Sequence, residues 1–231
     1  MDEQQSLPVH DAARDGKSLL LQSLLQHDPQ GVNKKDQDGR TPLFWAISTG
    51  GPEASSVILK FIREHKPKNF DIDETDDSGW TALHLAASTG NLSVIDQLYQ
   101  MVPDVNAQTT RGQTALHFAT SKGHIDVVRS LLDHGASPRT KDSLNQTPLH
   151  RAAAIGSLPI LKILVAAKCP INATDRSSWT ALHHAYAEGH GDVAVELLHA
   201  GADPDRTDAE GLTPEEVAVD DKVKKFVTAN S

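Results

Sequence analysis

Hydrophobic positions in the middle of the chain recur with helical spacing in two short runs. Within residues 109–141, Leu116 and Ala119 lie on one face of a predicted helix that ends before Gly123. The second run keeps the helical spacing with five aliphatic residues: Ile125, Val127, Val128, Leu131 and Leu132. Gly135 then supplies the left-handed conformation that commonly ends a helix. The pattern predicts a unit made of a turn and two short helices.

The same unit recurs along the chain with an almost constant period. A short phrase, of which Thr114-Ala115-Leu116-His117 is one copy, opens each first helix, and its threonine is placed to cap that helix. Five such threonines follow one another at intervals of 33 residues: Thr81, Thr114, Thr147, Thr180 and Thr213. An earlier copy begins at Thr41, and a fainter one begins at Leu7. This period and phrase resemble the ankyrin repeat, which is a β-turn followed by two helices.

The resemblance implies an all-α ankyrin-repeat solenoid of seven stacked helix-turn-helix repeats, with β-turn tips and a concave binding face. Each repeat of a solenoid buries its apolar face only against its neighbours, so we predict a single elongated domain over residues 1–231. The predicted repeats are approximately 1–35, 36–75, 76–108, 109–141, 142–174, 175–207 and 208–231. At the C-terminal end, Phe226 and Val227 are expected to close the core.

Some positions depart from the repeat pattern. Phe44 stands where the other repeats have the motif histidine, so we expect a buried ring in place of a polar link. Asn145 and Ser178 stand where the turn glycine usually stands. Because Asn tolerates the left-handed region better than Ser does, we expect the tip near Ser178 to be reshaped. The second repeat is longer than the others, with extra residues near Gly50-Gly51-Pro52 and around residues 65–69.

Composition and charge narrow the partners and the compartment. Lys and Arg total 22 against 31 Asp and Glu, for a net charge of −9, which disfavours binding to a phosphate backbone. No apolar run approaches the roughly 20 residues that a membrane span needs. The stretch Met1–Gln5 has neither the basic nor the apolar region of a signal peptide. The single cysteine, Cys169, fits a reducing compartment, so we expect the protein in the cytoplasm and nucleus. We also expect the chain to be a monomer on its own.

The sequence carries no motif for catalysis, a cofactor or a metal. It lacks a phosphate-binding glycine loop, a nucleophile elbow and zinc-binding spacings. Each motif histidine lies on a different repeat: His84, His117, His150 and His183. They are therefore too far apart to share one ion at bond lengths of about 2 Å. We expect them to make hydrogen bonds within the junction of turn and helix, and we expect no enzyme, no cofactor and no metal site.

Two positions of each repeat are candidates for contact with a partner protein. The tip residues before the motif threonines are Arg40, Trp80, Gln113, Gln146, Trp179 and Leu212, and the first-helix residues after the motif histidine are Trp45, Leu85, Phe118, Arg151 and His184. All three tryptophans therefore fall on one side of the predicted array, and Trp and Arg are common interface hot spots. Packing of each tryptophan on the adjacent tip is an equally open interpretation, and both can hold.

Charge changes sign along this predicted face. Acidic residues crowd the first tips, basic residues follow in the middle, and acidic residues return near the end: Asp36, Asp38, Asp71, Asp73, Glu74, Asp76 and Asp77, then Arg111, Lys122, Lys141 and Arg151, then Glu188, Asp208 and Glu210. Exposure of the tips to solvent is enough to explain why they are acidic, but it does not explain the change of sign along the face. The alternation indicates a partner with complementary patches, which favours specificity and fast association.

Several phrases outside the general repeat pattern resemble the gankyrin family of proteasome assembly chaperones, including its fungal members. They are Asp36-Gln37-Asp38-Gly39-Arg40-Thr41, Asp76-Asp77-Ser78-Gly79-Trp80, Ser121-Lys122, His150-Arg151-Ala152-Ala153, Glu188-Gly189-His190-Gly191-Asp192 and Val223-Lys224-Lys225-Phe226. The resemblance runs nearly end to end. It implies a protein without catalytic activity that binds the C-terminal domain of one ATPase subunit of the proteasome regulatory particle and hinders premature docking on the core particle.

The family's contact positions match Asp38, Arg40, Asp77 and Lys122 here. With the charge and tryptophan patterns, the predicted partner-binding residues are Asp38, Arg40, Trp45, Asp76, Asp77, Trp80, Phe118, Lys122, Arg151, Trp179 and Glu188. One family feature does not carry over, because the stretch His184-Ala185-Tyr186-Ala187-Glu188 lacks the Leu and Cys of the L-x-C-x-E phrase. The alternative function is a general ankyrin adaptor or kinase inhibitor that binds a signalling protein.

Overall fold

A computed structural model describes residues 7–49 and 51–231, and none of these residues is in a β-strand. The predictions made for Met1–Gln5 and for Gly50 fall outside the described residues. The chain divides into two compact units, Met1–Thr110 and Arg111–Ser231. Each unit is built from pairs of short helices joined by turns, as the all-α repeat prediction requires.

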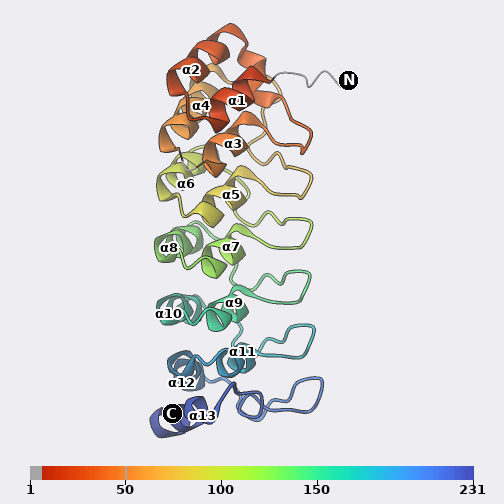
Figure 1. The fold of residues 1–231 in the computed structure, drawn as a ribbon, viewed down its shortest axis with the longest axis vertical. Coiled ribbons are helices and arrows are strands. Elements are labelled where there is room, and N and C mark those ends of the chain that lie inside the picture. The colour runs from red at the N-terminus through yellow and green to blue at the C-terminus, as the bar shows by residue number, and fades with distance from the viewer. Residues whose placement is uncertain (1–6, 50) are drawn as a thin grey trace. The chain divides into compact units, whose positions relative to one another are not determined.

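In the first unit, the helices form two columns, and long turns project from one side (Figure 1). Its elements are α1 (Pro8–Arg14), α2 (Ser18–His27), the short 3-10 helix η1 (Pro29–Asn33), α3 (Pro42–Ser48), α4 (Pro52–His65), α5 (Ala82–Thr89) and α6 (Leu92–Tyr99). The first helices pack in the order α1, α3, α5, and the second helices in the order α2, α4, α6. Helix α4 begins 11 residues after Thr41, the same interval as from Thr81 to the start of α6, so the extra residues predicted near Gly51 and Pro52 do not lie there. Helix α4 has 14 residues against 8 in α6, so the extra length of this repeat lies toward His65 and lengthens this helix.

The second unit repeats the same two columns (Figure 1). Its elements are α7 (Ala115–Ser121), α8 (Ile125–Asp133), α9 (Pro148–Ala154), α10 (Leu158–Ala166), α11 (Ala181–Ala187), α12 (Gly191–His199) and α13 (Asp221–Asn230). Here α9 packs between α7 and α11, α10 packs between α8 and α12, and α13 covers α12. The core lies between the columns, where Leu116, Val128 and Leu131 are fully buried.

A threonine and a histidine begin four of the first helices in the same way. In α5, the backbone N–H of Thr81 donates to Nδ1 of His84 at 3.0 Å, and Nε2 of His84 lies 3.0 Å from the carbonyl oxygen of Ala107 at the end of the same repeat. Because Nδ1 accepts a hydrogen bond, the ring is neutral and its proton is on Nε2, which donates to that carbonyl. His117, His150 and His183 make the same capping box, and Nε2 of each reaches a carbonyl oxygen in the tip of the following repeat. The predicted hydrogen bonding of the motif histidines is confirmed.

The repeat with Phe44 has the buried ring that the sequence predicts, since Phe44 is 4% exposed. Thr41 begins α3 without a side-chain capping bond, and the phenyl ring offers no acceptor for the backbone N–H of Thr41. The reshaped tip expected at Ser178 is wrong. Ser178 adopts the left-handed φ of 63° and Asn145 a φ of 60°, and both tips close with the same backbone hydrogen bond of 2.9 Å.

The C-terminal repeat differs from the prediction in two ways. Its first helix is reduced to a turn, in which the N–H and hydroxyl of Thr213 both donate to the carboxylate of Glu216. In α13, Val227 is 2% exposed and closes the core as expected, whereas Phe226 is 47% exposed. The expectation for Phe226 is therefore wrong: its ring lies against Gly191, at the start of α12, instead of beneath α13.

Candidate protein-binding surface

An aspartate at the start of each regular tip holds the turn closed. In the tip Asp175–Trp179, the Oδ1 atom of Asp175 accepts the backbone N–H groups of Ser177 at 2.8 Å and Trp179 at 3.0 Å. The same pair of hydrogen bonds organises the tips that begin at Asp36, Asp76, Asp142 and Asp208. This carboxylate therefore replaces part of the backbone pairing of a turn, a common use of Asp.

The second carboxylate oxygen in three of these tips binds the first helix of the same repeat. Oδ2 of Asp36 accepts the indole N–H of Trp45 at 2.7 Å. Oδ2 of Asp142 binds Nη2 of Arg151 at 2.7 Å, and Oδ2 of Asp175 binds Nε2 of His184 at 3.1 Å. Each pair is nine residues apart, so the tip aspartate orients the residue that follows the motif histidine.

These contacts lower the pKa values of two tip carboxylates, Asp36 and Asp175. Burial alone would raise the pKa of Asp36, but hydrogen bonds from the Arg40 N–H and the Trp45 indole outweigh burial and lower the pKa. The pKa of Asp175 is likewise lowered, because hydrogen bonds from Gln146, His184 and the tip backbone outweigh its burial. A charged acceptor makes the stronger type of hydrogen bond, which favours a fixed geometry for the donors.

In the first unit, the structure brings three other predicted residues, Asp38, Trp45 and Asp76, together around Arg40. Its guanidinium carbon lies 5.3 Å from the centre of the Trp45 ring, within the range of a cation–π interaction. Nε of Arg40 lies 3.7 Å from Oδ2 of Asp76, and its Nη1 lies 3.9 Å from Oδ2 of Asp38. Asp38 is exposed, whereas the Asp76 side chain is only 9% exposed. The nearly buried Asp76 therefore positions Arg40 and closes the third tip. The exposed Asp38 is free to contact solvent or a partner protein.

Beside Arg40, residues of the second and third repeats together line a hollow of about 310 Å³. Phe44 and Leu85 line it together with Trp80, and Asp76 and Arg40 give it a charged edge. Asp77 is exposed at the next position, and its backbone N–H donates to the carbonyl of Asp38 at 3.1 Å. An apolar hollow with charged edges is typical of a protein-binding hot spot.

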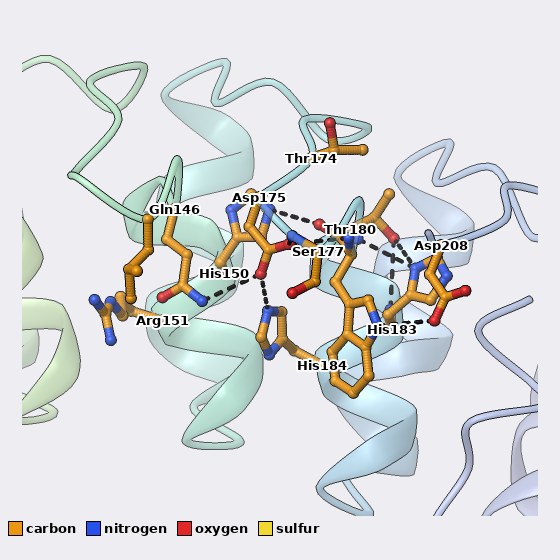
Figure 2. Close-up of polar contacts among 12 residues, drawn as sticks. Gln146, His150, Arg151, Thr174, Asp175, Ser177, Thr180, His183, His184 and Asp208 are labelled. Carbon is orange, nitrogen blue, oxygen red and sulfur yellow. Dashed lines mark hydrogen bonds and ion pairs between the residues drawn. The ribbon is translucent and has the colours of Figure 1, made fainter. Parts of the chain in front are cut away.

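In the second unit, Arg151 and His184 lie on neighbouring first helices, and the tip residues Gln146 and Asp175 lie above them (Figure 2). The carboxylate of Asp142 is 2% exposed and is neutralised by Arg151. Nε2 of Gln146 reaches Asp175 in the next tip at 3.3 Å. Arg151 is thus held by a buried acid, which fixes its position before any partner binds.

Trp179 packs on the adjacent tip, as one of the two interpretations of the tryptophans expects. Its indole N–H donates to Oδ2 of Asp208 at 3.0 Å, and its ring meets that of His184 edge-on at 5.1 Å. Phe118 is half-buried on α7, and Lys122 is exposed at the C-terminal end of that helix. Glu188 is exposed at the equivalent end of α11.

Sequence reasoning did not include Asp142, Asp175 and His184 among the binding residues. The signal was present, because an Asp precedes the first-helix donor by nine residues in each case.

The pKa of His150 is lowered to about 4, first because of burial and then because of its neighbour His184. Among the described residues, no group of three His, Cys, Asp or Glu side chains is arranged to hold a metal ion. No helix in the described part of the chain is long and apolar enough to cross a membrane.

Comparison with known proteins gives one family and several relatives. A family model described as ankyrin repeats (3 copies) matches residues 9–109, 55–142 and 137–208. Over 107 residues the chain is 43% identical to the "Probable 26S proteasome regulatory subunit p28" of Saccharomyces cerevisiae, and the match covers 45% of each chain. Over 80 residues it is 41% identical to the ankyrin repeat-containing protein C6C3.08 of Schizosaccharomyces pombe, which covers 35% of this chain and 31% of that protein. The matched segments span less than half the length of these curated relatives.

Among solved structures, the ankyrin repeat domain of Bcl-3, a member of the IkappaB protein family, is similar with a TM-score of 0.79. The sequences are 25% identical, and the match covers 98% of this chain and 100% of that chain. This similarity and the family match agree on a fold made for contact with other proteins.

Proposed function

Because the chain belongs to the ankyrin-repeat family, we propose that it is a non-catalytic assembly chaperone of the proteasome regulatory particle. In this proposal it binds the C-terminal domain of one ATPase subunit of that particle. The observation that carries the proposal is the 43% identity, over 107 residues, to a yeast protein named as a proteasome regulatory subunit. The tip phrases that resemble the gankyrin family point to the ATPase domain as the partner.

The structure supports a binding role for the predicted residues by the way it holds them. Arg40 is stacked on Trp45 and flanked by two acids, and Arg151 is fixed by the buried Asp142. Side chains held in one geometry lose less entropy on binding than free ones do. Asp38, Asp77, Lys122 and Glu188 are exposed, so their charges are available to a partner.

We expect the chain to act as a monomer in the cytoplasm and nucleus and to need no cofactor. A kinase inhibitor or general adaptor would use the same kind of surface, so the partner decides between the functions. The similarity to a proteasome subunit favours the chaperone.

The experiment is direct binding of the purified chain to the purified C-terminal domain of each regulatory-particle ATPase, measured by calorimetry. We expect one of these domains to bind with one-to-one stoichiometry and the others not to bind. Rising salt should weaken the complex, because charges at the rim of an interface are screened. If none of the domains binds, the chaperone proposal is wrong, and a kinase-activity assay with the same protein tests the alternative.

A further inference from the structure

A cleft of about 430 Å³ opens in the first unit and contains none of the predicted partner-binding residues. It lies among η1, the starts of α3 and α5, and the segment that follows α4. Val32, Leu43 and Phe44 form its buried floor, and the half-buried Phe70 and Ile72 form one wall. Its size is within the range of sites that bind small ligands or a few side chains.

Two departures from the repeat pattern meet at this cleft. Phe44 stands where a motif histidine would bond to the next repeat. Thr41 also lines the cleft, and its side chain makes no capping bond. The segment after α4 begins with Lys66 at a φ of 44° and continues with Asn69 at a φ of 58°. Lys66 is the left-handed C-cap that ends α4, and Asn69, which lines the cleft, belongs to the residue types that tolerate this conformation.

The charges at the mouth of the cleft are unevenly satisfied. Lys34 is paired with Asp28 at 2.7 Å, and Glu74 is paired with Lys35 at 2.6 Å. Asp71 is exposed and makes no ion pair with another described residue. At the wall, Oδ1 of Asn33 is buried without a hydrogen-bond partner in the described structure, which is uncommon in native proteins. The unmatched charge at this cleft is therefore negative.

We propose that the cleft binds a basic side chain, lysine or arginine, together with an adjacent apolar side chain of an extended segment in a partner protein. The apolar residue and the aliphatic stem of the basic residue would lie against Phe70 and Ile72. The cationic end would pair with Asp71. Long basic side chains commonly bury their stems in this way while their charge meets an acid or water. This site shares Phe44 with the hollow beside Arg40 but contains none of the predicted partner-binding residues, and it does not depend on the proposed chaperone function.

The test uses the full chain, labelled for NMR, and the dipeptide acetyl-Leu-Arg-amide as the probe. We expect saturable shift changes centred on Phe70, Asp71 and Ile72. The variant Asp71→Asn keeps the oxygen that accepts the N–H of Asp73 at 2.9 Å, so the turn should persist. Loss of the charge should weaken binding about two- to fivefold, because Asp71 is exposed and an exposed ion pair contributes up to about 1 kcal/mol.

Asp203→Asn is the matched control, because Asp203 accepts the N–H of Asp205 in the same local turn at 3.1 Å. This variant should bind the probe like the wild type, and acetyl-Leu-Glu-amide should cause no saturable shifts at the cleft. The proposal is overturned if Asp71→Asn binds the basic probe as tightly as the wild type, or if the acidic probe binds equally well. Affinity of Asp71→Asn for the ATPase domain is measured separately, so failure of one proposal is distinguished from failure of the other.

Discussion

Arg151 donates from Nη2 to Oδ2 of Asp142 at 2.7 Å, and the Asp142 carboxylate is almost completely buried. The other oxygen of Asp142 accepts the N–H groups of Leu144 and Gln146, so one side chain joins a tip to the first helix of its repeat. The pair fixes a cation that we assign to partner binding. Its strength can be measured without any partner.

A double-mutant cycle with Asp142→Asn and Arg151→Met should give a coupling free energy of about 1–3 kcal/mol, as expected for residues in direct contact. Asn keeps the oxygen that closes the turn and removes the charge. The exposed pair Lys60 and Glu64, 3.9 Å apart, is the control and should couple by less than about 0.5 kcal/mol. Equal coupling in the two cycles, measured by chemical denaturation, would contradict a special role for the buried pair.

Reversing Arg40 and Lys122 to Glu should weaken binding to the ATPase C-terminal domain by at least about tenfold, because truncating one partner of a desolvated charge pair costs about 2–5 kcal/mol. The thermal melting temperature should change little, since surface substitutions away from the core alter stability by about 0.5 kcal/mol or less. Calorimetry and thermal melting measure the two effects. Wild-type affinity in the double variant would show that these residues are not at the interface.

Ser178→Gly should stabilise the protein by up to about 1 kcal/mol. Ser178 holds a left-handed φ of 63°, which glycine adopts without a side-chain penalty. Asn145→Gly is the matched comparison at the same position of the previous tip and should gain less, because Asn tolerates this region better. Chemical denaturation of both variants measures the difference. A loss of stability in Ser178→Gly would mean that the Ser178 turn carries no strain.

Acidification should lower the free energy of unfolding between pH 6.5 and pH 4. Burial lowers the pKa of His150 to about 4 in the folded protein, so the unfolded chain binds more protons across this range. From a reference pKa near 6.5, His150 alone should cost about 2 kcal/mol of stability at pH 5 relative to pH 7. The pKa values of His117 and His183 are also lowered by burial, so their contributions have the same sign.

The variant His150→Phe tests this assignment, since Phe44 is the residue that the chain itself uses at the equivalent position. The variant should be less stable at pH 7, because it loses the link to the carbonyl of Trp179, and less sensitive to pH between 7 and 5. Denaturation curves at the two pH values give both quantities. An unchanged pH dependence would remove His150 from the explanation.

Removing residues 213–231 should lower stability by a few kcal/mol. Val223 and Val227 are the buried residues of α13, and full burial of one aliphatic side chain contributes about 1.5–3 kcal/mol. The single changes Val227→Asp and Phe226→Asp separate the two neighbours: the first should be severe and the second mild, since Phe226 is half exposed. Similar melting of the truncated and full-length proteins would show that the last repeat does not close the core.

Periodicity was sufficient to predict the fold, because helical spacing and the threonine–histidine phrase act within one repeat. It was insufficient at Ser178, where residue preference favoured a different turn but the carboxylate of Asp175 holds the regular one. It was also insufficient at Phe226, where helical spacing alone does not tell which of two adjacent apolar residues faces the core. For the candidate site, composition identified the charges, but only coordinates show that Asp142 and Asp175 are already used to hold Arg151 and His184.

The ring of Phe44 has a consequence for how the first unit opens. His10 bonds across to the carbonyl of Arg40 in the second repeat, but the phenyl ring of Phe44 makes no such bond from the second repeat to the third. In an array where neighbours stabilise one another, the weakest junction limits cooperativity. Backbone amides of α3 and α4 should therefore exchange with solvent at a lower free-energy cost than those of α5 and α6. The first two repeats can then fray as a pair, while the third keeps its protection.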